Sequence, residues 1–225
     1  MAFTFTSRGT GYTAYNSTLD SPSFTPTANS VLIVAVLGTT ANRPVDSVSG
    51  HGTWTELTDS PLVIPNNFDG CVWACVTGSS PSADVVTADW TGNNAAALAV
   101  IEISGDIDAT SVANAIVQQK GTSQYNSGGS PYTLTVTMDS SVTSGNCTVL
   151  AVFPKDSTNT VKTGWTSSVF ESTVGVGFHY IAAGEQSGEV SSATSFTGSG
   201  GIMIELAASS GDSSTILPHM MQHYL

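Results

Sequence analysis

The sequence is poor in charged residues, and cations are the scarcest of them. Charged side chains make up 10% of the 225 residues, and lysine and arginine number 5 against 17 aspartates and glutamates. So few cations cannot form a basic stripe that neutralises several phosphates. The formal net charge of -12 is also repelled by anionic membrane headgroups. We therefore expect neither nucleic acid nor a membrane among the partners.

Long apolar runs are missing as well. No segment reaches the roughly eighteen consecutive apolar residues of a membrane-spanning helix. Residues 1–6 lack the basic region and the apolar core of a signal peptide. These absences predict a chain that is made in the cytosol and stays soluble there.

Cysteine is rare, with only Cys71, Cys75 and Cys147 in the chain. Three cysteines cannot all pair. Cys71 and Cys75 are expected on one face of a strand, too far apart for a disulfide bond. The sequence therefore predicts buried free thiols.

Residues that usually anchor a metal or a catalytic base are also few. Among the four histidines, His219 and His223 have the spacing of zinc ligands on a helix. No Glu or Cys ligand accompanies them, and the chain has no Cys-x-x-Cys pair, so a polar helix edge explains them as well. Asp106 and Asp108 lack the twelve-residue loop of a calcium site, and turn capping is the commoner role. We expect no metal, no cofactor and no enzymatic activity.

Against these absences stands an internal repeat. The apolar run at residues 33–37 returns at residues 149–153, and the Trp-Thr pair at Trp54 returns at Trp165. Later in each repeat, a Val-Ile-Glu-Ile run matches a Met-Ile-Glu-Leu run. The order of these anchors is the same both times, as in a duplicated supersecondary unit. The predicted repeats are residues 30–104 and 146–207, with a connector at residues 105–145.

Short apolar segments between turn residues predict about a dozen strands and almost no helix. Residues 29–37 are expected to form a strand, and the continuous β-branched run in it predicts burial on both faces or a place at the centre of a sandwich. Residues 132–138 alternate like a half-buried strand. A first strand is expected only at residues 3–5, before a turn-rich approach at residues 8–26. One turn of helix is expected within residues 112–118.

The predicted fold class is all-β. We expect residues 1–208 to form a β-sandwich of jelly-roll or Greek-key type built from two similar halves, because one face of a small sheet needs a second layer to cover it. Residues 209–225 then form a linker and an apolar C-terminal tail. Such a tail docks back on its own domain or inserts into a partner. The predicted partner-binding residues are Ile216, Leu217, Met220, Met221, Tyr224 and Leu225.

Two acidic residues occupy equivalent positions in the closing strands of the two repeats. Glu102 and Glu205 could face a shared cleft about 5 to 10 Å apart, as glycoside hydrolysis requires. They could instead be solvated acids on symmetric outer strands. We favour the second interpretation, because duplication alone makes such acids recur.

The four tryptophans could stack on sugar rings if a concave face displayed them. Each has an aromatic counterpart in the other repeat, which favours core positions instead. The predicted counterparts are Trp54 with Trp165, Trp73 with Phe178, and Trp90 with Phe196.

The motifs of the first repeat resemble those of a family of viral proteins. These motifs are a Val-Leu-Ile-Val-Ala-Val strand, a Gly-x-Trp-Thr turn, a strand ending near Thr-Gly, a Val-Thr-Ala-Asp-Trp strand and a closing Val-Ile-Glu-Ile-Ser-Gly segment. Over residues 30–207 the chain resembles jelly-roll-like structural proteins of tailed bacteriophages, such as capsid decoration (cement) proteins and accessory tail or collar subunits.

This resemblance implies a non-enzymatic virion subunit that forms a homo-oligomer, often a trimer. It also implies that other virion proteins are partners and that assembly takes place in the host cytoplasm. The family supplies no catalytic residue. The main alternative is a carbohydrate-binding or receptor-binding β-sandwich module with a glycan as its partner.

Overall fold

The computed structural model describes residues 2–39, 44–65, 68–125, 132–154, 160–192 and 198–210. The predicted partner-binding tail residues and Phe196 lie outside these described residues. Within the described ranges, no helix has both the length and the apolar character needed to cross a membrane.

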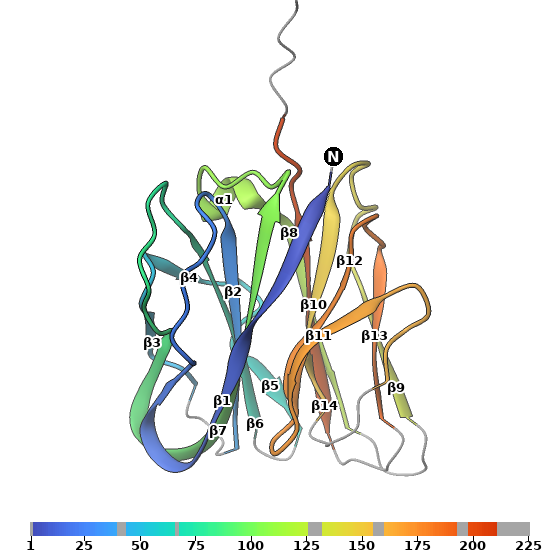
Figure 1. Cartoon of the computed structure of the whole chain (residues 1–225). Coiled ribbons are helices and arrows are strands. Elements are labelled where there is room, and N and C mark those ends of the chain that lie inside the picture. The colour runs from blue at the N-terminus through green and yellow to red at the C-terminus, as the bar shows by residue number, and fades with distance from the viewer. Residues whose placement is uncertain are drawn as a thin grey trace, which may run out of the picture.

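The described chain consists almost entirely of antiparallel strands (Figure 1), which confirms the all-β prediction. The first half contains β1 (Phe3–Asp20), β2 (Val31–Gly38), β3 (Ser47–Ser49), β4 (Trp54–Glu56), β5 (Leu62–Ile64), β6 (Phe68–Val76) and β7 (Thr87–Gly105). The second half contains α1 (Val112–Ala115), β8 (Ile116–Gln124), β9 (Tyr132–Thr137), β10 (Cys147–Phe153), β11 (Thr166–Glu171), β12 (Val176–Ile181), β13 (Ser187–Ser192) and β14 (Ser199–Leu206).

Two large sheets form a β-sandwich, and their strands follow the same order. The first sheet runs β4-β6-β2-β7-β1, and the second runs β11-β12-β10-β14-β8. β3 and β5 join the first sheet outside this path, while β9 and β13 form a separate pair. Each strand of the first path therefore has a counterpart in the second, and the two halves are related by an approximate twofold arrangement.

A central core fills the space between the two sheets. Alternate residues of β2 point into it, including Ile33 and Leu37, and so do alternate residues of β10, including Val149 and Phe153. Period-two alternation sends the residues between them to the opposite face of each sheet. Each large apolar side chain removed from water here contributes about 1.5 to 3 kcal/mol.

The outer faces of both sheets are covered as well. Leu32, Val34 and Val36 of β2 belong to a first outer core, under the end of β1, the start of β7 and β3. Leu150 and Val152 of β10 belong to a second outer core beneath β9 and β13. All residues of β2 and β10 are buried. This confirms the burial predicted for the apolar run of this strand, which starts at Val31, whereas Asn29 is exposed.

The first strand is much longer than the sequence predicts. β1 continues through the Gly-rich segment after Phe5 and pairs with β7 as far as Asp20, with register shifts between Ser7 and Gly9 and again after Thr13. The turn signals therefore mark bulges inside a bent strand, since Gly9 has a φ of +116° that suits only glycine. β1 and β7 each bend from the main sheet into the outer layer (Figure 1).

The predicted connector at residues 105–145 also contains regular structure. The expected helical turn forms as α1 but ends at Ala115, and β8 starts at Ile116 and pairs with β14. β8 is half-buried and polar, so its sequence carries no clear apolar period. β9 forms at the predicted place and pairs with β13.

One predicted counterpart is wrong by a single residue. Val34 lies opposite Trp73, and its counterpart Leu150 lies opposite His179 rather than Phe178. A shift of one residue moves a side chain to the other face of a sheet. Trp73 therefore packs on the first outer core, whereas Phe178 lies in the central core.

We expect Ile33→Ala to lower the free energy of unfolding by about 2 to 5 kcal/mol, because the change leaves a cavity in a core that both sheets share. Urea unfolding followed by tryptophan fluorescence would measure this. Val63→Ala is the control, since Val63 on β5 is 68% exposed and its loss should have little effect. Equal effects of the two changes would contradict the assignment of the central core.

Candidate functional site

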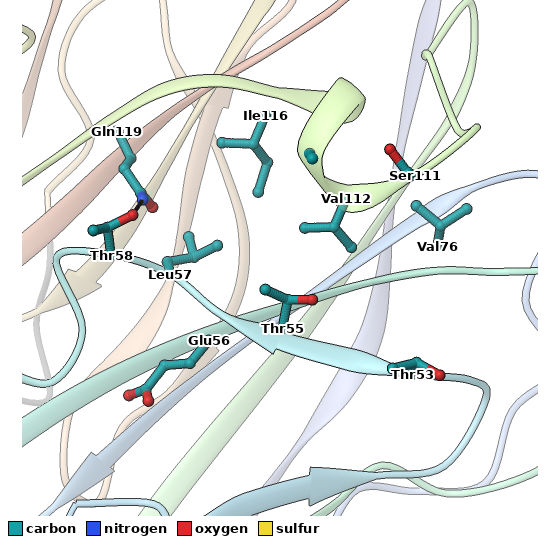
Figure 2. A pocket seen from close by; sticks show the side chains of 11 residues that line it. Thr53, Thr55, Glu56, Leu57, Thr58, Val76, Ser111, Val112, Ile116 and Gln119 are labelled. Atoms are coloured by element: carbon teal, nitrogen blue, oxygen red, sulfur yellow. Dashed lines mark hydrogen bonds between the residues drawn. The ribbon is translucent and has the colours of Figure 1, made fainter.

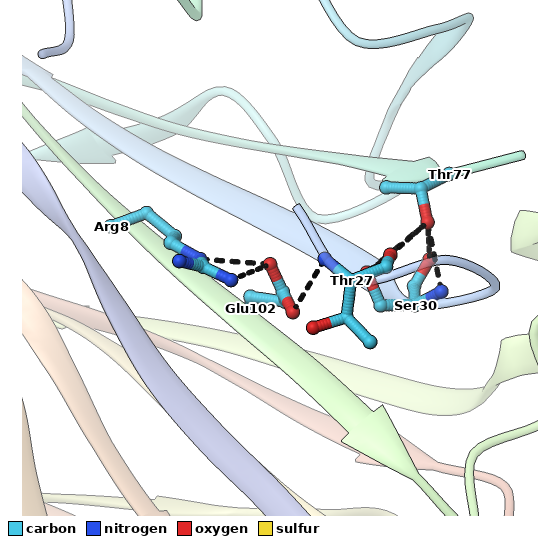
Figure 3. Close-up of polar contacts among 5 residues, drawn as sticks. All are labelled: Arg8, Thr27, Ser30, Thr77 and Glu102. Atoms are coloured by element: carbon cyan, nitrogen blue, oxygen red, sulfur yellow. Dashed lines mark hydrogen bonds and ion pairs between the residues drawn. The ribbon is translucent and has the colours of Figure 1, made fainter. Parts of the chain in front are cut away.

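Glu102 holds three segments together from near the C-terminal end of β7. Its side chain is fully buried, and Oε2 accepts hydrogen bonds from Nε and Nη2 of Arg8 on β1, each at 2.8 Å. Oε1 accepts the backbone N–H of Thr27 at 3.1 Å (Figure 3). The carboxylate thus ties β7 to β1 and to the loop before β2.

The loop around Thr27 is itself fixed by hydroxyl groups. The Thr27 carbonyl accepts hydrogen bonds from Thr77 Oγ1 and Ser30 Oγ, both at 2.9 Å (Figure 3). The Arg8 guanidinium lies 5.5 Å from the centre of the Phe24 ring, within the range of a cation–π contact. These contacts close the first outer core at this end.

Glu205 has the same kind of role in the second half. Its Oε1 accepts hydrogen bonds from Thr143 N–H at 2.8 Å and Asn146 Nδ2 at 2.6 Å, and its Oε2 accepts one from Gln118 Nε2 at 2.5 Å. Burial acts to raise the pKa of Glu205, but these donors outweigh it and the pKa lies below its ordinary value. Glu205 is therefore a buried, fully bonded carboxylate.

The structure corrects the favoured interpretation of both acids. They are not solvated and do not lie on outer strands: β7 and β14 are interior strands, and both residues are 0% exposed. Nor do they face a shared cleft, because their neighbours Ile101 and Ile204 point into the central core and alternation puts the acids on opposite outer faces. The arrangement provides no acid and base pair.

Three tryptophans occupy core positions, as the sequence predicts. Trp54, Trp90 and Trp165 are buried, and each indole N–H has an acceptor. These acceptors are Gly50 O at 2.6 Å, Asn16 O at 2.9 Å and Glu185 Oε2 at 3.0 Å, respectively. Trp73 is partly buried against the first outer core. None of the three buried rings is available for stacking on a sugar.

The three cysteines are free and buried, which confirms that prediction. Burial raises the pKa of the Cys71 thiol to about 12 and that of Cys75 to about 11, and it raises the pKa of Cys147 too. Since the thiolate is the nucleophile, none of these groups is reactive near neutral pH.

The two described histidines lie in different halves, while His219 and His223 lie outside the described residues. The His51 ring lies against the Phe24 ring with centres 4.3 Å apart, in a tilted arrangement. His179 is buried in β12, where burial lowers its pKa to about 4. In the part of the chain that the structure describes, no three His, Cys, Asp or Glu residues group together as a metal site.

Asp108 caps a turn, as expected. Its Oδ1 accepts hydrogen bonds from the backbone N–H of Thr110 at 3.1 Å and from the Thr110 hydroxyl at 2.6 Å. These two bonds fix the chain just before α1.

Sequence reasoning missed a pocket of about 610 Å³ between β4 and α1, which we call the β4–α1 pocket (Figure 2). It is lined by Thr53, Thr55, Glu56, Leu57, Thr58, Val76, Ser111, Val112, Ala113, Ile116 and Gln119. Its volume lies in the range typical of ligand sites. The polar lining groups are mainly hydroxyls, and apolar side chains lie between them.

The pocket lies at an edge of the sandwich where the approximate twofold arrangement is broken. At the opposite edge of the sandwich, Phe5 of β1 stacks on Tyr180 of β12 with ring centres 4.1 Å apart. Strand register makes Ile116 the counterpart of Phe5. Ile116 lies opposite Leu206, and Phe5 lies opposite Ile103, the counterpart of Leu206. In the same way, Ala74 is the counterpart of Tyr180. Ala74 lies opposite Thr55, and Tyr180 lies opposite Thr166, the counterpart of Thr55. Smaller side chains therefore replace both rings.

A second exposed feature is the outer edge of β1. β1 ends the strand order of the first sheet and pairs only with β7 among the described strands. Tyr12 is 44% exposed and Tyr15 is 76% exposed on this strand. The sequence predicts turns in this segment, so the open edge is found only from the strand pairing in the structure.

Comparison with models of protein families, with curated proteins and with solved structures found no match to this chain.

We expect Glu102→Gln to lower the free energy of unfolding by about 1.5 to 3 kcal/mol, because Arg8 loses its charged acceptor. Urea unfolding would measure the change. Asp139→Asn is the matched control, since it removes the exposed ion pair with Lys120 and should leave stability nearly unchanged. If both variants change the free energy of unfolding equally, the buried ion pair of Glu102 does not stabilise the contact between β7 and β1.

The buried His179 should make the protein less stable in weak acid. Its folded pKa of about 4 lies below the ordinary 6.5, so the unfolded chain takes up a proton first. The free energy of unfolding should therefore fall by on the order of 3 kcal/mol as the pH drops from about 6.5 to 4. His179→Gln should flatten this part of the stability curve. Glu185 and Glu205 have lowered pKa values, so the stability that these carboxylates contribute is lost mainly below their ordinary pKa of 4.5. An unchanged curve between pH 6.5 and 4.5 would contradict the prediction.

Proposed function

We propose that this chain is a non-enzymatic structural subunit of a tailed-bacteriophage particle. In this proposal it is a capsid decoration or accessory tail or collar protein that forms a homo-oligomer and binds other virion proteins. It is assembled in the host cytoplasm. The resemblance over residues 30–207 and the all-β sandwich support this assignment.

The observation that carries the proposal is the open edge of β1. Sheet edges invite pairing, and proteins that stay monomeric often block them with lysine or proline. Between Gly9 and Asp20, β1 has bulges but contains no lysine, arginine or proline. Instead it displays Tyr12 and Tyr15, and tyrosine is enriched in protein interfaces. This edge is therefore well suited to contact a neighbouring subunit.

The two acids at equivalent strand positions and the three cysteines are all buried in the described fold. Glu102 and Glu205 are buried with full sets of hydrogen-bond donors, and the thiols stay protonated. This use of the reactive side chains supports a binding role rather than turnover.

The alternative is a carbohydrate-binding or receptor-binding module. One observation favours it, because the exposed rings of Tyr12 and Tyr15 could stack on a sugar as well as on a protein. Glycan binding that is lost in Tyr15→Ala while the protein stays folded would support this alternative.

We expect the full-length protein to be an oligomer in solution and the double variant Tyr12→Ser, Tyr15→Ser to be a monomer. The change removes the large apolar contacts from the β1 edge. Light scattering after size-exclusion chromatography would measure the mass, and circular dichroism would verify the strand content.

The matched control is Tyr125→Ser, which removes an exposed tyrosine just after β8. This variant should keep the mass of the full-length protein. A wild-type protein that is monomeric at all concentrations, or a double variant that assembles normally, would contradict the role of the β1 edge.

A further inference from the structure

The β4–α1 pocket has an apolar lining that no described segment covers. Leu57, Val76, Val112 and Ile116 contribute apolar side chains from both sheets and from α1, and Figure 2 shows them around one space. The Glu56 carboxylate accepts a hydrogen bond from Ser60 at 2.8 Å and is already engaged. The pocket therefore suits an apolar occupant with few charges.

The described chain ends close to this pocket. Ser209 N–H donates to Asp106 O at 2.8 Å, and Ala208 forms a β-bridge with Ile107. Ser210 lines a second hollow together with Thr110, the residue just before the Ser111 cap of α1. In Figure 1, α1 and the chain after β14 lie at the same end of the sandwich.

The segment beyond Ser210 has the length and composition to reach and fill the pocket. Residues 211–215 are polar and span at most about 16 to 18 Å when extended. The helix α1 is a single turn, about 6 Å long, so the pocket wall lies within that reach. Of the ten residues 216–225, six are apolar and none is a lysine, arginine, aspartate or glutamate.

We propose that residues 216–225 dock in the β4–α1 pocket of their own chain. The apolar side chains of the segment replace the missing partner of Ile116, which lines the pocket and stands where the opposite edge has Phe5 in a stacked aromatic pair. Docking within one chain is favoured over docking on a second copy, because a short tether gives a high effective concentration. This inference does not depend on the proposed virion role.

Disulfide trapping in the full-length protein tests the contact. The double variant Ala113→Cys, Met220→Cys places one thiol at the pocket rim and one in the C-terminal segment. The three native cysteines are buried with raised pKa values and do not compete. Equilibration in a glutathione redox buffer, followed by mass spectrometry, gives the effective concentration of the two introduced thiols.

The matched control is Val63→Cys, Met220→Cys, because Val63 is exposed on β5 and does not line the pocket. We expect an intramolecular disulfide with an effective concentration at least about tenfold above this control. Adding Ile116→Trp, which fills the pocket, should reduce the value to that of the control, with circular dichroism verifying the fold.

Equal effective concentrations at Ala113 and Val63 would overturn the proposal, and so would a value that Ile116→Trp leaves unchanged. A disulfide that links two chains would also overturn it, because the occupant would then be the segment of a second copy. The effective concentrations are measured for disulfides within single chains. They are therefore independent of whether Tyr12 and Tyr15 mediate assembly.

Discussion

The structure depends on the burial of β2 and β10 on both faces. A strand with apolar side chains on both faces needs two apolar neighbours, so each sheet must pack on the other sheet and also beneath an outer layer. This constraint explains why β1 and β7 bend out of the main sheet, and why β9 and β13 form a separate pair over the second sheet.

Covering the outer faces also buries polar groups, and these groups must be satisfied. Glu102 and Glu205 lie on the two covered faces, and each accepts hydrogen bonds from the edge strand of its sheet and from a nearby loop. Burying a charge without such partners costs far more than burying it with them. Each acid therefore ties an interior strand of its sheet to the edge strand and to a loop.

Features of functional interest lie where the approximate twofold arrangement fails. The strand order is the same in both halves, yet one edge is filled by Phe5 and Tyr180 whereas the other contains the β4–α1 pocket. The β8 edge is contacted by Asp59 and by Val63 O, whereas β1 displays Tyr12 and Tyr15. Where equivalent positions in the two halves carry different side chains, core packing alone does not explain the surface that results.

The sequence by itself determined the strands that are apolar on both faces, the free thiols and the alignment of Ile33 with Val149, because these follow from local composition. Tertiary structure alone decided the path of β8, whose polar sequence is ordered by its pairing with β14. It also decided the face of Trp73, since a one-residue slip in pairing is invisible in sequence. The burial of Glu102 depends on Arg8, 94 residues away, and the pocket depends on side chains from two sheets. Such contacts join distant segments, so no local pattern reports them.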